Sequence, residues 1–335
     1  MRCAKLIRAL LSASLVIGTF ATTAPKAEPG HWPRGPVRVI TPYGSGTAND
    51  ATLRQFADRL AKRWNQPVTV ENRPGADTVV GVGAFVAAKD DHTLLFAGAA
   101  SLTIVPLMKD KVPYDPMRDF VPISTACNTT IIIASAASSN IVSLADLISR
   151  ARAQPGKLRW ASGPSLPKFL FDAFLKTQAL DMLYVPYKET TPQVTDLGEG
   201  RIDILVTGLV ATVPLHQAGK ARFLAVTNSE RAPSFPDVLT VKELGQPVMS
   251  ADGFSGFFGG RAMPVELRDQ IASDIRMVAL DPELRINLER IGQTLRVGTP
   301  PDFAAEIESQ RVWATELARL VDFKSTQASG PGPQR

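Results

Sequence analysis

The sequence predicts an α/β protein made of two lobes, each with a mostly parallel sheet flanked by helices. Short apolar segments rich in β-branched residues alternate with amphipathic segments along most of the chain, which is typical of helix-covered parallel sheets. At roughly 150 residues per domain, 335 residues are enough for two cores. No low-complexity linker divides the chain, so we expect the lobes to be connected more than once.

The N-terminal segment, residues 1–27, is interpreted as a cleavable signal peptide for export. Arg2, Lys5 and Arg8 precede the apolar run Ala9–Ala21, which is too short to span a bilayer, and small residues follow it. Cleavage is expected between residues 21 and 27, and the alternative is an uncleaved anchor. Losing the three basic residues that precede Lys26 lowers the formal net charge from +5 to +2, so the charge does not favour a nucleic-acid partner.

Strands and helices alternate from residue 36 onward. The first expected strand, 36–41, is β-branched and ends at Pro42 and Gly44. In the next helix, 53–64, Leu53, Phe56 and Leu60 repeat at helical spacing with charged residues opposite. The other elements expected in this part are a strand at 67–70, a helix at 79–89 and a strand at 93–97.

The alternation continues in the second half. Strands are expected at 131–134, 158–161, 182–185, 202–206 and 224–227. Helices are expected at 143–153, with Ser143 as N-cap, and at 168–177, 191–199, 264–279, 282–290 and 301–321. We assign residues 33–131 with 254–323 to lobe 1, residues 132–253 to lobe 2 and residues 324–335 to a disordered tail.

The loop between the first strand and the first helix is the main candidate binding site. Glycines let a backbone approach a ligand closely, and a helix N-terminus offers unpaired N–H groups and about half a positive charge. Gly44, Ser45, Gly46, Thr47 and Asn49 supply these features. The spacing matches neither a dinucleotide fingerprint nor a phosphate loop, which favours a carboxylate. The alternative is a tight turn without a ligand.

Two further features bear on this site. Asp50 would repel an anion unless its carboxylate turns to the backbone or meets a cationic part of the ligand. A second strand-to-helix loop, containing Ser162, Gly163 and Ser165, repeats the same context in the other lobe. Two such loops can face each other across a cleft between the lobes.

Catalytic and metal sites are not expected, and no cofactor is implied. After removal of the signal peptide Cys127 is the single cysteine, and His31, His92 and His216 lack metal-ligand spacing. The sequence contains no Gly-x-Ser-x-Gly nucleophile motif. A periplasmic hydrolase or lyase that uses the anion loop as an oxyanion hole is therefore the less favoured alternative to a binding protein.

Several phrases occur in an order that resembles a known family. They are VENRPGA at 70–76, PYDP at 113–116 with DFVP at 119–122, PGKL at 155–158, VPYK at 185–188, AGK at 218–220 and LAVT at 224–227. Together they are similar to the Bug-type solute-binding proteins, the extracytoplasmic receptors of tripartite tricarboxylate transporters. The resemblance extends from about Pro36 to Val321.

The resemblance implies a periplasmic-binding-protein fold that closes like a flytrap on a small carboxylate. Backbone N–H groups and hydroxyls of the loops Tyr43–Asp50 and Ser162–Ser165 would hold the carboxylate, with further contacts from Ser101 and Thr207. Implied partners are an organic acid, aromatic and amino acids included, and the permease subunits of a tripartite transporter. The receptor itself is expected to be a monomer. A protein of the same fold that docks on a sensor kinase is the alternative.

The chain departs from the family pattern near the implied site. Asn49 replaces a threonine, Glu189 a glycine and Thr207 an aspartate, and Lys168 lies in a shortened second loop. Lys168 would either add a positive group to the site or be a solvated helix residue. These departures concern the ligand rather than the fold.

Overall fold

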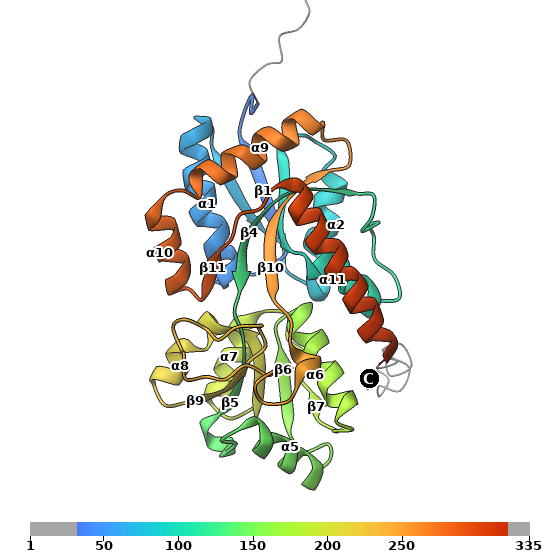
Figure 1. The fold of residues 1–335 in the computed structure, drawn as a ribbon, viewed down its shortest axis with the longest axis vertical. Helices are drawn as coiled ribbons and strands as arrows, with labels where there is room; N and C mark the ends of the chain where they lie inside the picture. The colour runs from blue at the N-terminus through green and yellow to red at the C-terminus, as the bar shows by residue number, and fades with distance from the viewer. Residues whose placement is uncertain (1–31, 321–335) are drawn as a thin grey trace, which may run out of the picture.

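The computed structural model describes residues 32–320, so the expected signal peptide and the expected tail at 324–335 lie outside the described residues. The described chain forms a six-stranded and a five-stranded sheet, which lie in separate lobes, one above the other in Figure 1. We call the lobe with the six-stranded sheet lobe 1 and the other lobe 2. Every helix within residues 32–320 is too short or too polar to cross a membrane.

Lobe 1 has helices on both faces of its sheet. Its strands are β1 (Val37–Thr41), β2 (Val68–Asn72), β3 (Thr93–Gly98), β4 (Phe120–Thr129), β10 (Gly253–Gly260) and β11 (Gln293–Leu295), in the order β11-β4-β10-β3-β1-β2. One face is covered by α1 (Ala48–Trp64), α9 (Val265–Val278) and α10 (Pro282–Arg290). The other is covered by α2 (Val79–Ala88), α3 (Ala100–Thr103) and the first turns of α11 (Pro300–Leu320). The short helix α4 (Val105–Met108) follows α3.

Lobe 2 has the same layered construction. Its strands are β5 (Ile131–Ala136), β6 (Arg159–Ser162), β7 (Leu183–Tyr184), β8 (Ile204–Gly208) and β9 (Ala221–Val226), in the order β7-β6-β8-β5-β9. Its helices are α5 (Leu144–Ala153), α6 (Leu166–Thr177), α7 (Thr190–Gly198) and α8 (Val213–Gln217). Alternation along β5 sends Ile131 and Ile133 to the core under α5 and α6, and Ile132 and Ala134 to the core under α7.

Both sheets are mixed, but most strands of each run in one direction, as expected: β10 and β11 in lobe 1 and β5 in lobe 2 run the opposite way. β1 pairs in parallel with β2 and β3, and β6 with β7 and β8, and these strands run toward the gap between the lobes. β10 pairs antiparallel with β3 and β4, and β5 with β8 and β9. The reason is connectivity: β5 and β10 begin at the gap as the chain passes from one lobe to the other, so they must run away from it.

Helix α11 also joins the two lobes. Phe303 near its start packs against Phe258 of lobe 1, with ring centroids 4.9 Å apart. Ten residues later Trp313 packs edge-on to Phe169 of α6, at 5.9 Å, and Leu317 is buried in the same core as α6. Figure 1 shows α11 running from lobe 1 down toward α6 along one side of the molecule. The lobes are therefore in apolar contact on this side.

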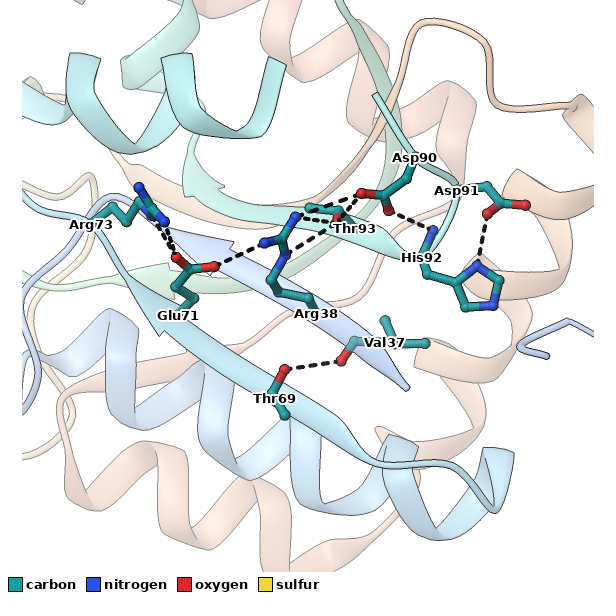
Figure 2. Close-up of polar contacts among 9 residues, drawn as sticks. All are labelled: Val37, Arg38, Thr69, Glu71, Arg73, Asp90, Asp91, His92 and Thr93. Carbon is teal, nitrogen blue, oxygen red and sulfur yellow. Dashed lines mark hydrogen bonds and ion pairs between the residues drawn. The ribbon is translucent and has the colours of Figure 1, made fainter. Parts of the chain in front are cut away.

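Charged side chains of lobe 1 pair with one another on the surface of its sheet (Figure 2). Arg38 on β1 lies between Glu71 of β2, at 3.5 Å, and Asp90, at 3.6 Å, and also donates to the Thr93 hydroxyl. Arg73 forms an ion pair with the same Glu71. Each of these exposed ion pairs contributes little to the free energy of folding, but together they favour the observed register of the neighbouring strands.

Candidate ligand-binding site

A cavity of about 360 Å³ lies between the lobes. It is lined by residues at or just beyond the carboxyl ends of β1, β3, β6 and β8, where ligands of α/β proteins commonly bind. The connections between the lobes contribute Thr129, Ile131 and Gly253 to the lining. Its volume falls in the range of small-molecule sites.

The first candidate loop, Tyr43–Asp50, is held rigidly at this cavity. The Thr47 hydroxyl caps α1 by accepting from the N–H of Asp50 at 3.3 Å, and it donates to the Gly44 carbonyl at 2.9 Å. Tyr43, Gly44, Ser45, Gly46, Thr47 and Asn49 all line the cavity.

Asp50 does not line the cavity, because its carboxylate is used to hold the loop. It accepts from the N–H of Gly46 at 2.9 Å, from Asn72 Nδ2 at 2.7 Å and from Arg54 Nε at 3.1 Å. Burial alone would raise the pKa of Asp50, but these donors outweigh it and hold the pKa below its usual value. Its charge is thus turned to the backbone and to neighbouring donors rather than to a ligand.

Two residues of this loop are oriented by other strands of lobe 1. The Ser255 hydroxyl of β10 donates to Asn49 Oδ1 at 2.8 Å, which leaves the Asn49 amide N–H₂ as the donor of that side chain. The Tyr43 hydroxyl accepts from the N–H of Gly98 at 3.1 Å. Burial raises the pKa of Tyr43, so its hydroxyl keeps its proton at neutral pH. Gly98, Asn49, Tyr43 and Ser255 all line the cavity.

The second candidate loop enters the cavity from lobe 2 at the start of α6. Gly163 lines the cavity together with Leu166, the first residue of α6. Ser165 adopts a left-handed backbone (φ 61°) that turns the chain into the helix, and its side chain makes no capping bond. Ser162 and Ser165 do not line the cavity.

The twelve residues predicted to bind a ligand therefore divide into two groups. Eight line the cavity: Tyr43, Gly44, Ser45, Gly46, Thr47, Asn49, Gly163 and Thr207. The other four, Asp50, Ser101, Ser162 and Ser165, are buried just behind the lining. The hydroxyls of Ser101, Ser162 and Ser165 make no hydrogen bond of regular geometry within residues 32–320, although Ser101 lies close to the Tyr43 hydroxyl and Ser162 close to that of Tyr184.

One wall of the cavity was not among the predicted binding residues, although Glu189 in it was noted as a departure from the family pattern. Glu189, Thr190, Thr191 and Thr195 line it from the start of α7. This segment is a further strand-to-helix junction, the same signal that indicated the first two loops. Lys168, by contrast, does not line the cavity: its ammonium lies 2.5 Å from Asp172 and 4.7 Å from the centre of the Tyr184 ring.

The lining offers neutral hydrogen-bond donors rather than cationic side chains. Among the described residues that line the cavity there is no Lys, Arg or His. The backbone N–H groups of Gly44, Ser45, Leu166, Thr190 and Thr191 have no acceptor within residues 32–320. Leu166, Thr190 and Thr191 begin α6 and α7, and Gly44 and Ser45 lie in the loop that leads into α1. The N-terminus of each of these helices carries about half a positive charge. This arrangement suits a small anion.

Part of the lining is apolar and suits a hydrocarbon group. Ile131, Leu166, Val194, Val210 and Phe254 contribute side chains to it. The candidate site thus combines neutral donors for an anion with a surface for an apolar body, and the described residues contain no cluster that could hold a metal ion.

Known proteins match this chain over most of its length. Residues 52–299 match the family described as "Tripartite tricarboxylate transporter family receptor". The chain is 28% identical over 320 residues to a UPF0065 protein of Bordetella bronchiseptica, covering 95% of this chain and 94% of that protein. It is 31% identical over 239 residues to protein BugT of Bordetella pertussis, covering 69% of this chain and 73% of BugT.

Solved structures agree with this match. A structure named "R. palustris Rpa4515 with adipate" superposes with a TM-score of 0.82 at 25% identity, covering 87% of this chain and 99% of that one. The periplasmic binding protein BugD superposes with a TM-score of 0.80 at 21% identity over 87% of this chain and 99% of BugD, a likeness of fold. The expected periplasmic-binding-protein fold is thereby confirmed. The proteins of this family are solute-binding proteins, so this chain is a solute-binding protein rather than an enzyme. It belongs to the receptor family of the tripartite tricarboxylate transporters.

Proposed function

We propose that the chain is a periplasmic receptor that captures a small carboxylate in the cavity between its lobes. After capture, residues 33–131 with 254–323 close against residues 132–253, and the closed monomer delivers the acid to the permease subunits of a tripartite transporter. Export would use the cleavable signal peptide at residues 1–27. The main support is the cavity, which is lined by three helix N-termini and, within the part of the chain that the structure describes, by no basic side chain. The structure of the related protein with adipate supports the ligand class.

The energetics of such a site are adequate for a transport receptor. Hydrogen bonds to a charged group contribute about 1.5–3 kcal/mol each. Four or five of them, reduced by the entropy of association and by the cost of closure, leave a net binding free energy near −8 kcal/mol. That corresponds to a dissociation constant of about 1 μM.

Isothermal titration with mono-, di- and tricarboxylates tests the proposal. We expect at least one acid to bind, and Ser45→Ala and Thr207→Val to weaken that binding about 3- to 30-fold by removing hydroxyls from the two facing walls. Neither variant should alter the urea midpoint by much, because neither hydroxyl holds a described structural contact. The control is Ser229→Ala, whose hydroxyl donates to Asp252 outside the cavity. Failure of every carboxylate to bind, or conversion of a bound acid to product, would contradict the proposal.

A further inference from the structure

We propose that the acid taken by this cavity carries an ammonium group, and that Glu189 is the residue that selects for it. The inference rests on the proposed function and narrows its ligand class to zwitterionic acids. Glu189 is the one formally charged residue among the described residues that line the cavity. In a receptor for simple anions, an acidic group in this lining would repel the ligand.

The Glu189 carboxylate is not engaged in holding the protein together. Glu189 is the N-cap residue of α7, yet its side chain makes no capping bond. It is exposed, and no ion pair or hydrogen bond joins it to another residue within residues 32–320. Asp50 provides the contrast, because three donors engage its carboxylate behind the lining. Glu189 is thus free to meet a ligand.

The charge balance of the cavity favours a ligand with one negative and one positive group. Three helix N-termini supply a combined effect of roughly one and a half positive charges. One ligand carboxylate together with Glu189 already offsets this. A second ligand carboxylate would leave an excess of negative charge that no Lys, Arg or His among the described lining residues neutralises. An ammonium group instead gains an attractive partner in Glu189.

The size of the effect is limited by solvent. Because Glu189 is exposed, its attraction to a nearby ammonium is screened by water and salt. We therefore expect a selectivity of about five- to tenfold for the ammonium group, not the larger factor of a buried ion pair. The selectivity should also shrink as the salt concentration rises.

Matched acids separate this inference from the proposed function. The probes are hexanoate, 5-aminopentanoate and 2-aminohexanoate, which differ in whether and where an ammonium is present, and adipate, which carries a second carboxylate. Each is titrated into the full mature protein, into Glu189→Gln and into Glu230→Gln. Glu230 is an exposed glutamate of lobe 2 outside the cavity, so its replacement makes the same charge change without touching the lining.

We expect wild-type protein to bind at least one amino acid more tightly than hexanoate. Glu189→Gln should lower that ratio about five- to tenfold and strengthen adipate binding about threefold, whereas Glu230→Gln should change neither. Equal selectivity in wild type and Glu189→Gln overturns the assignment of Glu189. If hexanoate or adipate binds and both amino acids bind more weakly, this inference fails while the proposed function stands. If no probe and no acid of the wider panel binds, both fail.

Discussion

Replacing Asp50 by Asn tests whether a buried carboxylate holds the first binding loop in place. In the wild type Oδ2 accepts from the N–H of Gly46 and from Arg54 Nε, while Oδ1 accepts from Asn72 Nδ2. Asparagine is nearly the same size but turns one of these oxygens into an N–H₂ group. That group must face either the Gly46 N–H or the Asn72 amide, so one buried donor loses its acceptor.

The expected cost follows from these contacts. Losing one charge-assisted bond costs about 1.5–3 kcal/mol, and leaving a buried donor unpaired costs about 1–3 kcal/mol. Rotation of the Asn72 amide could relieve the clash, but it would break the bond from Asn72 Nδ2 to the Tyr43 carbonyl. Arg54 is about half exposed, so its pairing with Asp50 adds little. We expect a loss of about 3 kcal/mol.

Urea unfolding and ligand titration measure this loss. With an m-value near 3 kcal/mol per molar, the midpoint should fall by about 1 M. Affinity should fall as well, because the loop lines the cavity. The control is Arg54→Met, which removes only the exposed partner and should cost less than about 1 kcal/mol. A midpoint of Asp50→Asn equal to that of wild type would refute the role assigned to the carboxylate.

The pH dependence gives an independent check of the same residue. The folded pKa of Asp50 lies below its unfolded value of about 3.9, so its stabilisation is present above that value. The stabilisation is lost as the pH falls through the folded pKa. The difference between wild type and Asp50→Asn should therefore be complete at pH 7 and shrink below about pH 4. A difference that grows on acidification would show that the charged form is not the stabilising one.

Two further predictions concern other parts of lobe 1. In Gly98→Ala the added Cβ would lie 2.7 Å from the Tyr43 hydroxyl, so that hydroxyl must move. We expect ligand titration to show about tenfold weaker binding, with little change in the urea midpoint. Unchanged affinity would argue against a role for Tyr43 in binding. Cys127 is buried and its thiol pKa is raised to about 12 by burial, so in the mature protein an aromatic disulfide reagent at pH 8 should label it only after unfolding. Rapid labelling of the native protein would contradict the packing around β4.

The elements found from sequence are those with a strong periodic signal. Helix α1 was expected from the spacing of Leu53, Phe56 and Leu60, and all three are buried in the lobe 1 core. Ser143 caps α5 as expected, by accepting from the N–H of Asp146. Both signals are local, so each helix can be recognised from a single stretch of sequence.

The elements that were missed depend on contacts between distant segments. β10 contains four glycines in eight residues and reads as a loop, yet it pairs with β3 on one side and β4 on the other. Gly256 is required there because a Cβ would lie 2.4 Å from the Ser124 carbonyl oxygen. The strands of lobe 1 that oppose the common direction are β10 and β11, and neither was expected from the sequence, so the antiparallel pairing in this sheet was not foreseen. The cavity wall at Glu189 could not be predicted for the same reason, because its position opposite the other two loops depends on the tertiary structure.

The site and the connections between the lobes occupy the same place, and this has a mechanical consequence. Strand β4 passes into β5 at Thr130, and the Asn228 side chain clamps this point by donating to the Thr129 carbonyl at 2.9 Å and accepting from the N–H of Ile131 at 2.8 Å. Thr129 and Ile131 also line the cavity, as does Gly253, where the chain returns to lobe 1. Any change in the angle between the lobes must therefore alter backbone that forms the cavity wall. Conversely, a ligand that contacts this wall and both loops makes its best set of contacts at one particular angle between the two lobes. Since the donors are backbone N–H groups held by different lobes, opening of the lobes moves the two sets of donors apart, which provides a way to release the ligand carboxylate.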